Sequence, residues 1–152
     1  MIRLKMPSSM GYRDLAMRFV ASTCKLVNPR RVHRATGRSR PDPDFDDQVI
    51  SAFGEAFNNA VIHSYGPSGG ELEIEVQTAE DRLVIMLRDF GRPFDMSKIP
   101  RPDLDSLPES GLGIFIMRSC MDDVTYTSGT PNVLSMTKFL VHDDDEVADE
   151  VR

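Results

Sequence analysis

Residues 55–65 read Glu-Ala-Phe-Asn-Asn-Ala-Val-Ile-His-Ser-Tyr, and this stretch decides how the remaining sequence is interpreted. It continues a predicted helix that starts near Phe45, with Asp44 as its N-cap. The helix carries an apolar stripe at helical spacing, formed by Val49, Ala52, Phe53, Ala56 and Ala60. Glu55 and Asn59 are four residues apart, so both side chains stand beside this stripe at the edge of the predicted core.

The pair of Glu55 and Asn59 has two interpretations. A neutral carboxamide oxygen suits Mg²⁺, and a carboxylate can take a proton from an attacking hydroxyl. The alternative is an exposed glutamate beside an ordinary helix asparagine, and the pair taken alone favours this plainer interpretation. His63, one turn further along, is expected to turn toward the stripe as a packed histidine rather than a ligand.

Two strands are predicted next. Leu72, Ile74 and Val76 alternate with polar residues, which predicts a strand with one solvated face. Residues 83–87 are continuously apolar, which predicts a central, covered strand.

Asp89-Phe90-Gly91 follows this strand directly, where an acid can accept a hydrogen bond from an exocyclic amine such as that of adenine. Gly91 would let the backbone approach a flat ring, and a plain turn is the equal alternative.

Ser110-Gly-Leu-Gly113 opens a predicted helix over residues 111–122 that is apolar nearly all round and is therefore expected to be buried. Two glycines at a helix start expose amide groups that can hold phosphate, although a tight turn has the same letters. No Walker-type loop is present. Residues 95–110 are rich in proline and aspartate and are predicted to form a lid-like loop.

The remaining segments complete an α+β pattern. Residues 2–6 alternate as a strand, and a helix that begins after Pro7 and is ended by Pro29 follows. The apolar face expected for that helix consists of Tyr12, Leu15, Ala16, Phe19, Val20 and Leu26. Residues 124–127 and 133–141 are the last two strands. We expect one domain over residues 1–141 and an acidic, disordered tail over residues 142–152.

Composition narrows the class of protein. The chain has 152 residues, a net charge of -6 and two distant cysteines, which argues against a structural zinc site and for a reducing compartment. It has no apolar run of membrane-spanning length and no signal peptide, so we expect a cytoplasmic protein without a membrane partner.

Five arginines lie in one predicted loop: Arg30, Arg31, Arg34, Arg38 and Arg40. Without interleaved aromatic residues, this loop is expected to be solvated rather than to contact nucleic acid directly, and it could still face an acidic protein partner.

Taken in order, the three motifs resemble the nucleotide-binding boxes of the GHKL ATPase superfamily. The segment 55–65 is similar to the E-A-x-x-N-A-x-x-H-x-Y segment of anti-sigma-factor serine kinases. Residues 110–117 (Ser-Gly-Leu-Gly-Ile-Phe-Ile-Met) and 121–124 (Met-Asp-Asp-Val) continue the likeness. The resemblance implies a two-layer α/β sandwich of the GHKL (Bergerat) ATP-binding type. Its mixed, mostly antiparallel sheet would be covered on one face by helices.

The resemblance also implies roles for individual residues. Glu55 matches the general base, Asn59 the Mg²⁺-binding asparagine and Asp89 the adenine-binding acid, with Gly91 beside it. The other implied nucleotide contacts are Phe94, Ser110, Gly111, Leu112, Gly113 and Ile114.

Three positions depart from the family pattern. Pro93 replaces a glycine near the adenine, Glu109 stands where some members have arginine, and Val133 stands where the last strand often carries an adenine-side threonine. The change at Glu109 leaves transition-state charge less well compensated.

The implied function is that of an ATP- and Mg²⁺-dependent serine protein kinase that acts as an anti-sigma factor. It would phosphorylate a STAS-type anti-anti-sigma protein, bind a sigma factor, and form a homodimer through its first strand and helix. The alternative is a nucleotide-binding anti-sigma or adaptor switch without efficient kinase activity. A plain ATPase or a detached histidine-kinase catalytic domain is the third interpretation.

Overall fold

The computed structural model describes residues 1–27, 44–64, 69–93 and 111–140. Its elements, in chain order, are β1 (Ile2–Pro7), η1 (Met10–Tyr12), α1 (Arg13–Val27), α2 (Phe45–Asn59), η3 (Ala60–Ser64), β2 (Glu71–Thr78), β3 (Arg82–Asp89), α3 (Leu112–Cys120), β4 (Asp123–Thr127) and β5 (Asn132–Phe139). The predicted lid, arginine-rich loop and acidic tail lie outside the described residues.

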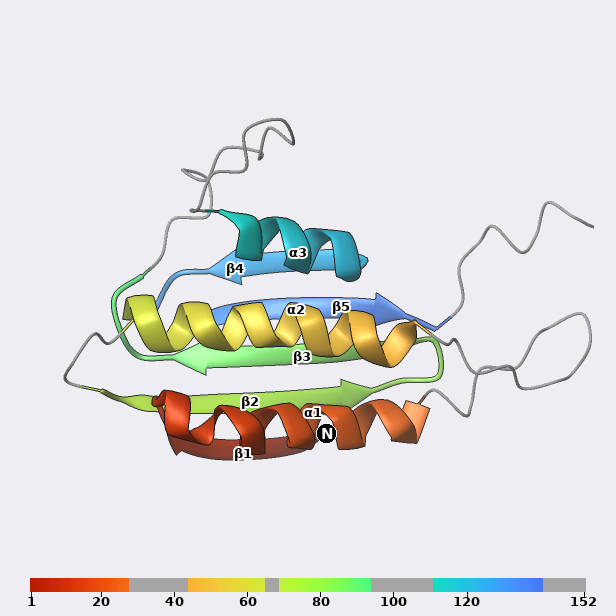
Figure 1. Ribbon diagram of the computed structural model, residues 1–152, viewed down its shortest axis with the longest axis horizontal. Helices are drawn as coiled ribbons and strands as arrows, with labels where there is room; N and C mark the ends of the chain where they lie inside the picture. Colours follow the sequence, from red (N-terminus) through yellow and green to blue (C-terminus); the bar gives the residue numbers. More distant parts are fainter. Residues whose placement is uncertain (28–43, 65–68, 94–110, 141–152) are drawn as a thin grey trace, which may run out of the picture.

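Five strands form one sheet in the order β1-β2-β3-β5-β4, and every neighbouring pair is antiparallel. The three α-helices lie on the same face of this sheet, with α2 over its middle (Figure 1). The prediction of a two-layer α/β sandwich is therefore confirmed. The continuously apolar strand was correctly predicted to be central, because β3 has two strands on each side.

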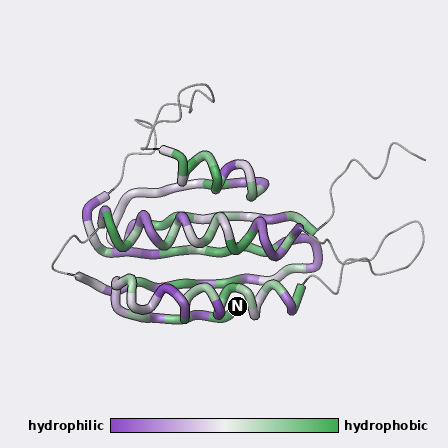
Figure 2. The backbone as a smooth tube through the Cα atoms, in the orientation of Figure 1, coloured by the Kyte–Doolittle hydropathy of each residue, from purple (hydrophilic) through white to green (hydrophobic). Residues whose placement is uncertain are grey.

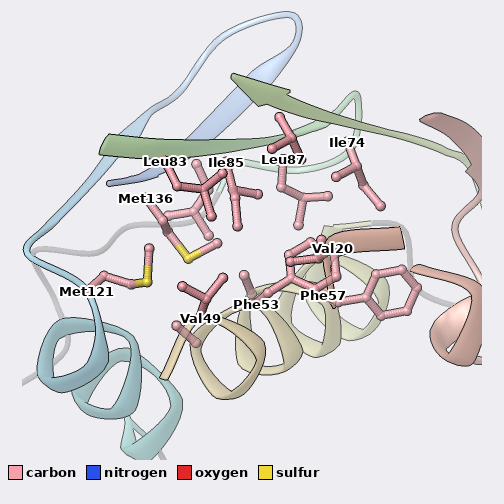
Figure 3. Packing of buried hydrophobic residues seen from close by; sticks show 14 of the residues in the cluster. Val20, Val49, Phe53, Phe57, Ile74, Leu83, Ile85, Leu87, Met121 and Met136 are labelled. Carbon is pink, nitrogen blue, oxygen red and sulfur yellow. The ribbon is translucent and has the colours of Figure 1, made fainter. Parts of the chain in front are cut away.

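The core lies between α2 and the middle strands. All five residues of the predicted α2 stripe are buried. Phe53 and Phe57 point from α2 toward β3, where Leu83, Ile85 and Leu87 are also buried (Figure 3). Burial of each such side chain contributes about 1.5–3 kcal/mol. This packing fixes α2 firmly on the sheet, so the polar residues at its edge have defined positions.

The predicted apolar face of α1 is partly wrong. Ala16 and Val20 are buried, but Tyr12, Leu15 and Leu26 are 41%, 51% and 51% exposed. The residues of α1 that are buried are Ala16, Val20, Thr23, Cys24 and Val27. These side chains are small, so the helix can lie close to the sheet, and its larger apolar residues fall on a neighbouring, exposed stripe.

The predicted solvated face of β2 is also wrong. Glu73 and Glu75 are only 7% and 2% exposed, although the alternation of polar and apolar residues along β2 is real (Figure 2). Neighbouring strands explain the burial, because β1 places Arg3 opposite Glu75 and β3 places Arg88 opposite Glu73. The long stems of these cations cover the carboxylates while their charged ends pair with them.

The helix α3 is buried on one side only, which corrects the prediction of a fully buried helix. Its first half is strongly hydrophobic (Figure 2), but only Ile114 and Met117 are buried. Leu112 and Phe115 are 43% and 37% exposed. The reason is that α3 lies over the β4 edge of the sheet, where a helix can cover the strands with only one of its faces (Figure 1).

Candidate functional site

Four segment ends lie at one end of the molecule, and three of them carry predicted site residues. These are the end of α2, the end of β3, the start of α3 and the start of β5, all toward the left in Figure 1. The antiparallel pairing of β3 with β5 sets Asp89 directly opposite Asn132. The fold thus gathers residues that are far apart in the sequence at one end of its two layers.

Glu55 reaches from α2 to the first turn of α3. Its Oε2 atom lies 2.7 Å from the position that a Cβ atom on Gly113 would occupy. Glu55 is half-buried, and within the described part of the chain its carboxylate has no hydrogen-bond or ion-pair partner. A half-buried carboxylate without a partner among these residues can accept a proton from a ligand.

Asn59 lies one helical turn beyond Glu55 and is also half-buried. Its carboxamide, too, makes no hydrogen bond to the described residues, whereas Oδ1 of the adjacent Asn58 accepts a 3.0 Å hydrogen bond from Arg13 Nε. The two asparagines therefore differ in role. Asn58 ties α2 to α1, and Asn59 is available to a ligand.

The start of α3 presents backbone amides. Gly111 is its N-cap and has φ 102°, a left-handed conformation that glycine adopts without steric cost. The first amide bonded within the helix is that of Phe115, which donates to the Gly111 carbonyl at 3.2 Å. The amides of Leu112, Gly113 and Ile114 precede that bond, so they and the helix dipole can hold an anion.

Asp89 lies at the end of β3 and is 6% exposed. Its Oδ1 accepts hydrogen bonds from the Gly91 amide at 3.0 Å and from Asn132 Nδ2 at 2.9 Å. The Asp-x-Gly motif therefore forms a turn that the aspartate itself stabilises, and this turn also keeps the carboxylate in place. A turn and a site for an exocyclic amine are therefore compatible interpretations of this motif.

Asn132 is the site residue that sequence reasoning missed. Val133, which stands where the family pattern often has an adenine-side threonine, pairs with Arg88 and lies on the opposite face of the sheet from Asp89. Asn132 is fully buried and contacts Asp89 directly. A signal was present in the sequence, since asparagine is disfavoured in strands and its place at the start of one indicates a specific hydrogen-bonding role.

The remaining predicted residues are exposed or lie outside the described residues. His63 is exposed and does not face the α2 stripe, because residues 60–64 form a π-helical turn in which α-helical spacing no longer applies. Pro93 is exposed. Phe94, Glu109 and Ser110 lie outside the described residues.

The residues present fit a magnesium ion that is held mainly by a nucleotide. Among the described residues, no group of three or more His, Cys, Asp or Glu side chains could enclose a metal ion. Asn59 offers one neutral oxygen, with the carboxylate of Glu55 one turn away. That donor set suits Mg²⁺, which keeps several waters and takes further oxygens from phosphates.

Comparison with known families agrees with this geometry. The sequence pattern of the histidine kinase-like ATPase domain matches residues 20–138. The chain belongs to this family. Within the family, it is 35% identical over 106 residues to the serine-protein kinase RsbW of Bacillus velezensis, an alignment that covers 64% of this chain and 66% of RsbW. It is 32% identical over 108 residues to RsbW of Oceanobacillus iheyensis, covering 65% and 68%. The chain thus spans about two thirds of the length of these relatives.

Solved structures share the fold of this histidine kinase-like ATPase domain. The histidine kinase domain of the Erythrobacter litoralis EL346 blue-light activated histidine kinase superposes with a TM-score of 0.50 at 19% identity, covering 88% of this chain and 64% of that chain. The Acinetobacter baumannii histidine kinase AdeS gives 0.51 at 12% identity, covering 93% and 70%. Within the described residues, no helix is long and apolar enough to cross a bilayer.

Proposed function

We propose that the protein is an ATP- and Mg²⁺-dependent serine protein kinase that acts as an anti-sigma factor. Its substrate would be a serine of a STAS-type anti-anti-sigma protein. The observation that carries this proposal is the contact of the Glu55 carboxylate with Gly113, which brings a proton acceptor to the amides that would hold phosphate. The similarity to proteins named serine-protein kinase supports the choice of phosphoryl acceptor.

The proposed transfer uses the residues in separate roles. Glu55 accepts the proton of the serine hydroxyl while that oxygen forms a bond to the γ-phosphorus and the bond to the β,γ-bridging oxygen breaks, so that ADP leaves. The amides of Leu112, Gly113 and Ile114 hold the phosphates. Asn59 would hold Mg²⁺, which offsets the charge of the phosphates when bound. Because little covalent chemistry is required of the protein, fixed positions and charge are what these residues contribute.

Asp89 accounts for the choice of nucleotide. Its carboxylate accepts hydrogen bonds, so it matches the 6-amino group of adenine and disfavours the 6-oxo group of guanine. The rigid turn around it keeps the carboxylate in one orientation. We therefore expect ATP to bind more tightly than GTP.

The test is incubation of the protein with γ-labelled ATP, Mg²⁺ and the cognate STAS protein. We expect label on one serine of the STAS protein, and none on a variant with that serine replaced by alanine. Tight ATP binding without transfer of label would favour the alternative function, a nucleotide-binding switch without efficient kinase activity. Label on a histidine would point to a histidine-kinase catalytic domain instead.

The sigma factor and a second copy of the chain are the proposed partners, and α1 with β1 is their proposed surface. Leu15 and Leu26, eleven residues apart on one side of α1, are each 51% exposed, and Met10 is 48% exposed nearby in sequence. β1 lies at the edge of the sheet, where a strand has unpaired backbone groups. We expect a homodimer, and light scattering that gives a monomer mass at micromolar concentration would contradict it. Pull-down from the native cell with and without ATP would identify the sigma factor.

A further inference from the structure

Asn132 is a fully buried polar side chain at the start of β5, and all of its hydrogen-bonding atoms in the structure point to the end of β3 or the turn before β5. Nδ2 donates to Asp89 Oδ1 at 2.9 Å and to the Gly91 carbonyl at 3.1 Å. Oδ1 accepts from the Gly129 amide at 3.1 Å. One carboxamide therefore ties the start of β5 to the end of β3 and to the turn before β5.

The orientation of this carboxamide is determined by its partners. A backbone N–H can only donate and a backbone C=O can only accept, so the Gly129 amide must face Oδ1 and the Gly91 carbonyl must face Nδ2. Rotating the amide by 180° would break both contacts and would also turn Oδ1 toward the Asp89 carboxylate. Asn132 therefore presents a donor to Asp89 in the only arrangement that satisfies all three partners.

This arrangement divides the two oxygens of Asp89 between the protein and a ligand. Oδ1 accepts from Asn132 and from the Gly91 amide, whereas none of the described residues donates to Oδ2. We propose that Asn132 is a positioning residue for nucleobase recognition: by occupying Oδ1, it leaves Oδ2 as the acceptor for the amino group of a 6-aminopurine nucleotide. The inference rests on the proposed binding of ATP and adds a specificity role for a residue outside the expected site.

If Asn132 acts by positioning Asp89, its effect on affinity depends on the nucleobase. A nucleotide whose purine lacks the 6-amino group does not use Asp89 Oδ2, so its affinity should not depend on how Asp89 is held. Purine riboside triphosphate differs from ATP by that amino group alone. Comparing the two ligands separates a positioning role for Asn132 from a general role in stability.

The experiment measures the affinity of both nucleotides by calorimetry, with Mg²⁺, for the full chain and its variants. Asn132→Ala removes every contact of the carboxamide, and Val133→Ala is the matched control, because Val133 is adjacent but lies on the opposite face of the sheet. We expect Asn132→Ala to weaken ATP binding about tenfold or more, as expected for loss of a hydrogen bond to a charged group. Affinity for purine riboside triphosphate should change less than about twofold, and Val133→Ala should leave both affinities unchanged.

Two further variants keep the test decisive. Asn132→Asp has the same shape and retains the acceptor for Gly129, but it faces Asp89 with a second carboxylate, so ATP selectivity should fall at least as far. If Asn132 acts through Asp89, then the double variant Asp89→Asn/Asn132→Ala should bind ATP no more weakly than Asp89→Asn alone.

The possible outcomes distinguish failure of the positioning role of Asn132 from failure of the proposed ATP binding. Loss of affinity for both nucleotides in parallel, with Asn132→Asp behaving the same way, would overturn the positioning role. Unchanged ATP affinity in both Asn132 variants would overturn it as well, while leaving the proposed ATP binding intact. A wild-type protein that binds neither nucleotide would overturn the proposed function itself.

Discussion

The carboxylate of Glu55 occupies the space that a side chain on Gly113 would need. Oε2 lies 2.7 Å from where that Cβ would stand, a separation that real Cβ atoms essentially never show. Gly113 therefore does more than open a helix. The absence of a side chain there is what allows the carboxylate of Glu55 to lie beside Gly113 in the first turn of α3.

Gly113→Ala should impair transfer far more than stability. The atom in conflict is the far end of a flexible side chain, so Glu55 can turn away at a cost of about 0.5–1.5 kcal/mol or less. A displaced base, however, should slow phosphoryl transfer about tenfold to a hundredfold. Gly11→Ala is the control, since its Cβ would meet only Ser9 Oγ at an ordinary 3.7 Å. Thermal melting and labelled-phosphate transfer measure the two effects, and an equal loss in both variants would contradict the steric argument.

Glu55→Gln keeps the shape of the side chain and removes the base. Because Glu55 has no partner among the described residues, the substitution breaks no described contact and nucleotide affinity should survive. Transfer to the STAS protein should fall by ~10²–10⁴-fold, the usual contribution of a general base. Single-turnover rates at saturating ATP are the measurement. Loss of ATP binding together with activity would indicate a structural role for Glu55 instead.

Asp89→Asn should weaken ATP binding by ~1–3 kcal/mol, because a charge-assisted hydrogen bond becomes a weaker one. Its new amide would also face Nδ2 of Asn132 unless it rotates, which places the remaining oxygen away from the ligand. Asp81→Asn is the control, as Asp81 lies beyond the other end of β3 and pairs with Arg82 at 2.6 Å. Calorimetry that finds equal ATP affinity for Asp89→Asn and wild type would remove Asp89 from the adenine contact.

Acid should destabilise the fold through Glu75. Hydrogen bonds from Gln77, Arg3 and Arg88 lower the pKa of this buried carboxyl to about 2. A carboxyl whose pKa is lowered on folding contributes its full stability above its unfolded pKa of about 4.3 and loses it as the pH falls toward 2. The contribution is about 1–3 kcal/mol, since Arg3 is partly exposed and screened.

Glu75→Gln tests this expectation by urea unfolding between pH 7 and pH 2.5. The variant should be less stable at pH 7, and its stability should fall less steeply than that of wild type below about pH 4.5. Glu80→Gln is the control, because Glu80 is exposed in the turn between β2 and β3. Parallel pH profiles for wild type and Glu75→Gln would show that the carboxylate contributes no such stability.

The five arginines of residues 30–40 should steer an acidic partner without contributing to the nucleotide site. Both ends of the segment that contains them, at the end of α1 and the start of α2, lie toward the right in Figure 1, away from the site residues. Replacing all five with serine should leave ATP affinity unchanged, slow partner association and flatten its salt dependence. Abolished ATP binding would place the loop in the active site, and lost affinity for DNA at physiological salt would restore a nucleic-acid role.

The sequence was sufficient for the order of elements and for the central strand, because apolar periodicity reports which faces are covered. The same periodicity gives a wrong prediction where a strand that is distant in the sequence buries the residues. Glu73 and Glu75 alternate as a solvated face would, yet residues of β1 and β3 bury them, and no local pattern shows which strand becomes the neighbour. The exposed leucines of α1 could not be separated from the buried residues by spacing alone, since both stripes repeat at helical intervals.

The site was predictable where a motif brings its residues together in one short segment. Glu55 and Asn59 share a helix, and Asp89 and Gly91 share a turn. Asn132 was not predictable in this way, because its contact with Asp89 depends on the register of β3 against β5, and a shift of one residue moves every side chain to the other face. Val133, which stands where the family pattern often has an adenine-side threonine, is one residue away from Asn132.

The pairing of β1 with β2 affects how this chain assembles. Arg3 and Glu75 are partners across the two strands although 72 residues separate them in the sequence. The hairpin of β2 and β3 is local, so closing it costs little chain entropy. β1 can pair with β2 only after a long loop has closed, and this loss of entropy comes before any stabilising contact forms. During synthesis from the N-terminus, β1 is made before its partner strand exists and must wait for it. We therefore expect β1, although it is made before β2 and β3, to dock after their hairpin has formed.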